Sequence, residues 1–123
     1  MPGDASTSEG LSQLVREINE REDHIDVLVN NAGTAWGAPF GEFPVKGWDK
    51  VMDINVKSPF FLTQALTPLL SKNASAQNTS TVINIGSIAG ILGNGLDTFS
   101  YAVSKSAIHQ VTRVLATELA ASH

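Results

Sequence analysis

Two short aliphatic runs, far apart in the chain, restrict the fold more than any other feature of the sequence. Ile25–Asn30 and Thr81–Ile85 are rich in β-branched side chains, and each leads into a glycine-containing turn. Runs of this length and composition are typical of buried parallel strands. Parallel strands need a long crossover connection, which is usually a helix. The chain between the two runs should therefore contain a helix.

Two further helices are predicted outside the runs, because apolar residues recur there every three or four positions. The first covers about residues 7–23, and Ser6 and Glu9 have the spacing of a capping box at its start. The second covers Ser100–Ala121 at the other end of the chain.

The helix between the runs is predicted over Trp48–Lys72, the longest segment with helical periodicity. Pro59 and Pro68 lie inside it, and each should bend it, because proline cannot donate a helical hydrogen bond. Glycine-containing loops are expected before this helix, over residues 31–47, and after the second strand, over residues 86–98.

The predicted order is helix, strand, helix, strand, helix, which is the alternation of an α/β domain with a parallel sheet. No internal repeat or linker divides the chain, so residues 1–123 are expected to form one domain. A doubly wound sheet usually has about five strands or more. We therefore predict a partial Rossmann-like doubly wound parallel sheet with about two strands and three helices, that is, an incomplete domain.

Composition excludes several kinds of partner and site. Eight basic and twelve acidic residues are scattered along the chain and give a net charge of −4, which argues against nucleic acid and anionic membranes as partners. The absence of cysteine excludes disulfides and thiolate sites, and favours a cytoplasmic location. The start of the chain has no basic, apolar leader, and no stretch reaches the roughly 18 apolar residues of a membrane span.

Tyr101 and Lys105 are the first candidates for chemistry. They lie four positions apart at the start of the last predicted helix, so both side chains should lie on one helix face. An ammonium group near a phenol favours the ionised phenol, which is what an acid or base working near neutral pH requires. The pair alone is also common on exposed helices, so other residues must support it.

Polar residues at both predicted strand ends provide this support. Ser87 follows the second strand, and Asn30-Asn31-Ala32-Gly33 closes the first, so both should lie at the edge where open parallel sheets bind ligands. Asn55 lies inside the middle helix, and Pro59 has no N–H to donate to the Asn55 carbonyl. That carbonyl is available to another donor.

Together these residues resemble the short-chain dehydrogenase/reductase family. The matching elements are Asn30-Asn31-Ala32-Gly33, Asn55-Val56, Ile83-Asn84-Ile85-Gly86-Ser87 and Tyr101-Ala102-Val103-Ser104-Lys105, with Ser87 preceding Tyr101 by 14 positions. Within the family, Thr34–Gly37 and the segment from Ser71 to Ser87 are most similar to β-ketoacyl reductases, including the type of rhamnolipid biosynthesis. Polyol and sugar reductases share the same catalytic set.

The resemblance implies an NADP- or NAD-dependent oxidoreductase that reduces a small-molecule carbonyl, with a 3-oxoacyl group as one candidate, to an alcohol. Its implied roles are Tyr101 as general acid, Lys105 as partner of Tyr101 and of the nicotinamide ribose, and Ser87 as donor to the substrate carbonyl. Asn55 would hold a water molecule through its backbone carbonyl. Asn31 and Asp4 complete the implied cofactor-binding residues, Asp4 as the residue that touches adenine. The family also implies a homo-oligomer.

The family's Gly-rich, pyrophosphate-binding turn is absent from residues 1–123. The segment Gly93–Thr98 lacks the third glycine and follows the wrong strand. Two interpretations therefore stay open: the middle of a reductase about twice as long, or a truncated, non-catalytic remnant.

Two other kinds of site are disfavoured. A serine hydrolase would need glycines where Ile85 and Ala89 flank Ser87, and His109 is interpreted as a polar residue on a helix face. His24 and His123 are isolated in the sequence, so no metal site is expected.

Overall fold

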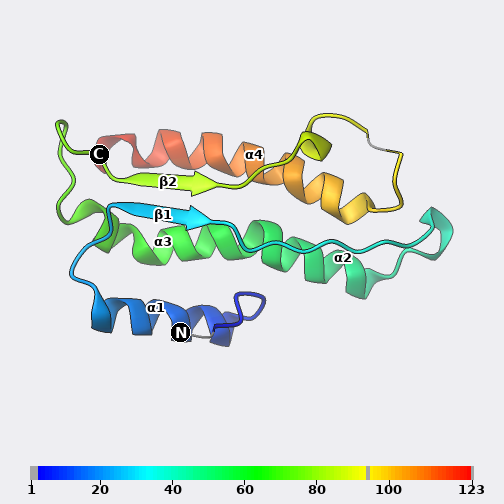
Figure 1. The fold of residues 1–123 in the computed structure, drawn as a ribbon, viewed down its shortest axis with the longest axis horizontal. Helices are drawn as coiled ribbons and strands as arrows, with labels where there is room; N and C mark the ends of the chain where they lie inside the picture. The colour runs from blue at the N-terminus through cyan, green and yellow to red at the C-terminus, as the bar shows by residue number, and fades with distance from the viewer. Residues whose placement is uncertain (1–2, 94, 123) are drawn as a thin grey trace.

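The computed structural model describes residues 3–93 and 95–122, and it has the predicted α/β architecture (Figure 1). The helices and strands, in chain order, are α1 (Ser8–Arg21), β1 (Val27–Asn30), α2 (Val45–Met52), α3 (Ser58–Ser71), β2 (Thr81–Asn84) and α4 (Phe99–Leu119). Among the described residues, no helix combines the length and apolarity needed to cross a bilayer.

β1 and β2 form a parallel two-stranded sheet, with Val27 paired to Thr81 and Asn30 paired to Asn84. The helices cover one face of this sheet. The core on that face consists of Leu66, Leu69 and Leu70 of α3. The residues packed against it come from α1, the segment before β1, both strands and α3 itself: Val15, Ile18, Ile25, Leu28, Leu62 and Val82.

The prediction that the first strand is buried is wrong for one of its faces in the described part of the chain. Leu28 faces the helices, but Val27 and Val29 are 55% and 51% exposed on the opposite face. Ile83 of β2 is exposed on that face too. The reason is that successive strand residues point to opposite sides, and the described helices cover only one of them.

The capping box predicted at Ser6 and Glu9 is also wrong, by one residue. Thr7 is the N-cap of α1, and its Oγ1 accepts a hydrogen bond from Gly10 N over 3.0 Å. Ser6 is engaged elsewhere, because its N–H and hydroxyl both donate to Asp4 Oδ1, over 2.9 and 2.6 Å. Thr7, the next residue with a hydroxyl, therefore caps the helix in place of Ser6.

The long middle helix begins at Val45, earlier than predicted, and is interrupted near Pro59. Asp53–Lys57 forms a π-helical turn, in which Ser58 N donates to Asp53 O. Pro59 then stands in the first turn of α3, where a missing N–H does little harm. The second proline, Pro68, lies inside α3, which continues to its end without such a turn.

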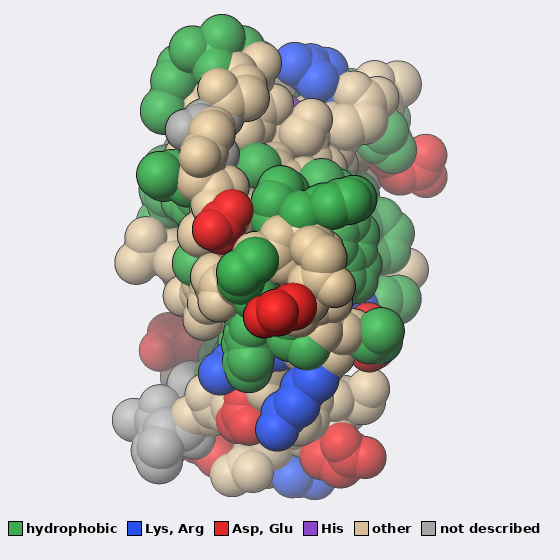
Figure 2. Space-filling model, turned by 90° about the vertical axis from the view of Figure 1, so that its right-hand side faces the viewer, with side chains coloured by type: hydrophobic (Ala, Val, Ile, Leu, Met, Phe, Trp, Pro, Cys, Tyr) green, Lys and Arg blue, Asp and Glu red, His purple; other side chains and the backbone are tan. Residues whose placement is uncertain are grey.

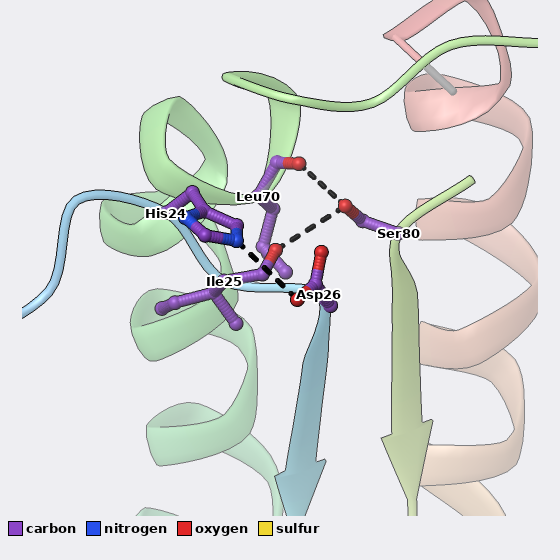
Figure 3. Close-up of polar contacts among 5 residues, drawn as sticks. All are labelled: His24, Ile25, Asp26, Leu70 and Ser80. Atoms are coloured by element: carbon purple, nitrogen blue, oxygen red, sulfur yellow. Dashed lines mark hydrogen bonds and ion pairs between the residues drawn. The ribbon is translucent and has the colours of Figure 1, made fainter. Parts of the chain in front are cut away.

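A polar junction joins the helix layer to the starts of the two strands (Figure 3). The Ser80 hydroxyl lies 2.6 Å from Leu70 O at the end of α3 and 3.2 Å from Ile25 O before β1. His24 Nε2 lies 3.4 Å from Asp26 Oδ2 in the same junction. One hydroxyl thus links three segments that are distant in sequence, at the end of the sheet opposite the candidate site.

Candidate active site

The carboxyl ends of β1 and β2 point toward the same end of the molecule, at the right of Figure 1. The loop after β1, the π-turn and the first turns of α4 meet there. This is the edge at which open parallel sheets bind ligands. The candidate residues can therefore be placed on one side of the fold.

Asn55 is buried in the π-turn and is fully engaged in hydrogen bonds. Its Oδ1 accepts from Thr34 N, and its Nδ2 donates to Thr34 O and to Ser104 Oγ, all three over 2.9 Å. The side chain is only 3% exposed. This single amide holds the loop after β1 and the start of α4 to the middle helix.

Lys105 is also buried, and it faces the same place from α4. Its Nζ donates to Ile85 O over 2.7 Å and lies 5.7 Å from the centroid of the Tyr101 ring. A Cβ atom on Gly33 would lie 3.6 Å from Asn55 Oδ1 and 3.9 Å from Lys105 Nζ. The structure therefore brings Asn55 and Lys105 together beside Gly33, and the Tyr101 ring lies next to Lys105.

Ser87 lies just beyond the end of β2, in extended backbone, and is the N-cap of a short 3-10 helix at Ile88–Gly90. Its Oγ accepts a hydrogen bond from Ala89 N over 3.2 Å, and its N–H donates to His109 Nε2 over 3.4 Å. The hydroxyl donates to no acceptor in the described part of the chain, so its proton is available to a ligand.

The two remaining candidates lie apart from this group. Asn31 follows β1 and is exposed. Asp4 precedes α1, where the hydroxyl of Ser6 and then its N–H donate to the carboxylate and lower the pKa of Asp4 below its usual value. The polar contacts of Asp4 are thus within its own turn.

Three residues of the site were named from the sequence only as parts of longer segments, without a role of their own: Thr34, Ser104 and Ile85, which bond to Asn55 or Lys105. Ser104 had a detectable signal, because it precedes Lys105 directly. His109 is more than a polar residue on a helix face, since it accepts the Ser87 N–H. The sequence could have indicated this role, because His109 lies one helical turn after Lys105 and so on the same helix face.

Exposed apolar side chains surround this end of the molecule (Figure 2). Phe40 is 82% exposed, and Ile88, Ile91, Leu92 and Leu96 are exposed as well. Three contacts join the segment around Phe40 to the loop before α4 and to the first residue of that helix. Ala38 N donates to Asp97 O over 3.0 Å, and the Phe40 and Phe43 rings each meet Phe99 edge to face at 5.6 Å.

A metal centre has no support in the described residues, because no three His, Asp or Glu side chains cluster there in a way that could hold an ion. His123 lies outside the described residues.

The family model for short chain dehydrogenases matches residues 1–123. The chain belongs to this family. It is 48% identical over 123 residues to the rhamnolipids biosynthesis 3-oxoacyl-[acyl-carrier-protein] reductase of Pseudomonas aeruginosa, covering 100% of this chain and 48% of that protein. It is 39% identical over 121 residues to the 2-dehydro-3-deoxy-D-gluconate 5-dehydrogenase of Escherichia coli, covering 98% and 46%.

Solved structures of this family have the same fold. The Pseudomonas aeruginosa RhlG/NADP active-site complex superposes with a TM-score of 0.95 at 48% identity, covering 100% of this chain and 48% of that one. The NADH-dependent reductase A1-R' complexed with NAD superposes with a TM-score of 0.91 at 35% identity, covering 99% and 52%. The chain thus spans about half the length of the relatives that it matches, and its two-stranded sheet corresponds to part of their Rossmann fold.

Proposed function

We propose that the protein is an NADP- or NAD-dependent carbonyl reductase in which Tyr101 is the general acid. The observation that carries this proposal is the position of Lys105: its Nζ lies beside Asn55 at Gly33, next to the Tyr101 ring, and is hydrogen-bonded to the segment that leads to Ser87. Reduction of a carbonyl to an alcohol needs a hydride on the carbon and a proton on the oxygen, and these residues would supply the proton beside a cation.

Ser87 and Tyr101 both act on the oxygen atom of the reacting carbonyl in this proposal. Ser87 donates its free O–H to the carbonyl oxygen, and Tyr101 donates a proton to the same oxygen as negative charge develops on it. Lys105 is 7% exposed, and its Nζ lies 5.7 Å from the centroid of the Tyr101 ring, so a cation stands beside the proposed acid.

Asn55 has a structural and a proton-handling role in this proposal. Its side chain holds the site together, and its backbone carbonyl, which Pro59 cannot engage, holds a water molecule that returns a proton to Lys105 and Tyr101.

The residues present fit the nicotinamide end of the cofactor. Gly33 leaves space beside Lys105 Nζ, which donates one N–H to Ile85 O and keeps two for ribose hydroxyls. Asn31 would line the cofactor site, and Asp4 would contact adenine. When bound, the cofactor supplies the hydride that is added to the carbonyl carbon.

The substrate that we propose is a 3-oxoacyl group. The exposed side chains Phe40, Ile88, Ile91 and Leu92 provide apolar surface next to the site, which suits an acyl chain better than the hydroxyl groups of a sugar acid. The 3-oxoacyl reductase from Pseudomonas aeruginosa supports this choice, whereas the gluconate dehydrogenase from Escherichia coli represents the alternative.

Tyr101→Phe in the full-length protein tests the proposal. We expect kcat for reduction of acetoacetyl coenzyme A to fall by about 10²- to 10⁴-fold, because the proton donor is lost while the ring remains. The affinity for NADPH, measured by its fluorescence, should change little. Retention of most of the turnover would show that Tyr101 is not the acid. A wild-type protein that neither binds NADPH nor oxidises it would favour a non-catalytic remnant.

A further inference from the structure

We propose that His109 is a positioning residue for the reaction: it holds the backbone of Ser87, and so aims the Ser87 hydroxyl at the substrate carbonyl. This inference rests on the proposed function. His109 touches neither Tyr101 nor Lys105 by a hydrogen bond in the described structure; its polar contact is the Ser87 N–H. It therefore acts through another residue.

The segment Ile85–Ser87 continues the line of β2 and is held by β1 and by α4. Ile85 N donates to Asn30 O over 3.1 Å, which extends the pairing with β1 by one residue. Lys105 Nζ of α4 bonds to Ile85 O over 2.7 Å, and His109 Nε2 of the same helix accepts the Ser87 N–H over 3.4 Å. Two side chains of α4 thus continue the hydrogen bonding where the pairing with β1 stops.

The geometry of extended backbone explains why Lys105 and His109 can reach Ile85 O and Ser87 N from the same helix. The C=O of one residue and the N–H of the residue two positions later point to the same side of an extended chain. Ile85 O and Ser87 N form such a pair. Side chains four positions apart on a helix lie one turn apart on the same face, as Lys105 and His109 do. The spacing on the helix matches the spacing on the strand.

Gly86 lies between the two hydrogen bonds and provides a second, independent observation. A Cβ atom at this position would overlap His109 Nε2, so the imidazole packs directly on the glycine backbone. Gly90 is similar, since its Cβ would lie 2.6 Å from the backbone carbon of Lys105. The segment from Gly86 to Gly90 therefore packs closely against α4. The ring of His109 limits how closely Gly86 can approach the helix.

This contact controls the hydroxyl of Ser87. Ser87 is the N-cap of the 3-10 helix at Ile88–Gly90, and its Oγ already accepts the Ala89 N–H. With the backbone held by His109 and the oxygen bound to the Ala89 N–H, the rotation of the Ser87 side chain is restricted. Without the imidazole, the peptide before Ser87 would be free to move toward the space that the ring had filled.

A double-mutant cycle in the full-length enzyme tests whether His109 acts through Ser87. We expect His109→Ala to lower kcat about 10- to 100-fold, as a misplaced group does, with an unchanged Kd for NADPH. In a Ser87→Ala background, His109→Ala should have almost no further effect on kcat. An equal fall in both backgrounds would overturn the proposal, because His109 would then act independently of Ser87.

The hydrogen bond also has a signature that does not depend on activity. An Nε2 that accepts an N–H must be unprotonated, so nitrogen NMR should show His109 as the Nδ1–H tautomer, with a coupling to the Ser87 amide. His24, which is partly exposed, serves as an internal reference. An imidazole proton on Nε2 of His109 would refute the proposal even in an active enzyme. Conversely, an Nδ1–H tautomer in a protein without reductase activity would leave the contact intact and remove only the proposed function.

Gly86→Ala tests the packing of the His109 ring on Gly86, because it places a methyl group where the imidazole lies. We expect it to lower the free energy of unfolding in the wild-type background and to lower it much less in the His109→Ala background, since the smaller side chain leaves room. Equal losses in both backgrounds would mean that the ring does not support Gly86.

Discussion

The amide of Asn55 and the hydroxyl of Ser104 share a hydrogen bond of 2.9 Å that joins the π-turn to α4. Ser104 Oγ also forms a second hydrogen bond, in which it donates to Tyr101 O over 2.7 Å. The residue proposed as the acid is therefore tied through one serine to the amide that holds the loop after β1. Stability and activity should both depend on this connection.

Ser104→Ala tests the connection by comparison with Ser100→Ala. Both serines are fully buried on α4, but the Ser100 hydroxyl has no hydrogen-bond partner in the described structure. A buried bonded hydroxyl stabilises a protein by about 1 kcal/mol, and a buried unbonded one costs about 1–3 kcal/mol. We expect Ser104→Ala to lower the free energy of unfolding by denaturant and Ser100→Ala to raise it.

The exposed Ser106 provides the control for that pair. Ser106→Ala measures the helix propensity gained by replacing serine with alanine, which both buried variants also gain. Relative to this control, similar changes at Ser100 and Ser104 would show that their hydrogen bonding does not differ.

Asn55→Asp keeps the shape of the side chain but removes two donors and adds a buried charge. Thr34 O would face a carboxylate oxygen in place of the amide N–H. We expect a loss of about 2–4 kcal/mol in the free energy of unfolding at neutral pH, measured by urea denaturation. Asp53→Asn in the same turn is the control, because the Asp53 side chain is partly exposed and its ion pair with Lys57 should contribute little. Equal stability of Asn55→Asp and wild type would contradict the observed bonds.

Ser80→Ala should destabilise the end of the sheet away from the site. The variant removes the hydroxyl between Leu70 O and Ile25 O, and we expect a loss of about 1 kcal/mol in the free energy of unfolding. The exposed neighbour Thr79, changed to Ala, should give a smaller loss. In the proposed enzyme, kcat should be unchanged in both variants, since Ser80 lies at the opposite end of β2.

A polypeptide of residues 1–123 expressed alone should self-associate. Val27, Val29, Ile83 and Ile85 are exposed on one face of the two-stranded sheet, and such a face is a site for association with another chain. Sedimentation velocity should detect species larger than a monomer. Val29→Thr and Ile83→Thr, which keep β-branching but add a hydroxyl, should reduce the association. A compact wild-type monomer with a cooperative thermal transition would refute this prediction.

The sequence predicted the elements that depend on local patterns. Both strands, the outer helices and the helical spacing of Tyr101 and Lys105 were found where periodicity placed them. The N-cap was missed because the competition of Asp4 for Ser6 is a contact between side chains, which a motif does not show. The exposed face of β1 was missed because burial depends on which elements cover a strand, not on its own composition.

The roles of Ser104 and His109 needed tertiary structure. Each forms its key bond with a residue on a different element, Asn55 of the π-turn in one case and Ser87 after β2 in the other. The spacing along α4 identified the helix face, but it could not show what lies against that face. The π-turn itself had one local signal, the proline at position 59.

This π-turn also affects which elements α2 and α3, the two halves of the middle helix, pack against. A π-turn holds one residue more than the equivalent α-helical turn, and each residue of a helix rotates the chain by roughly 100°. Because of that rotation, α2 contacts α4, whereas α3 turns to α1 and the sheet. Deleting one residue from Asp53–Lys57 would rotate Leu66 and Leu70 by roughly 100° relative to α2, although none of the remaining side chains would change. For this stretch, the number of residues is as strong a constraint on the fold as their identity.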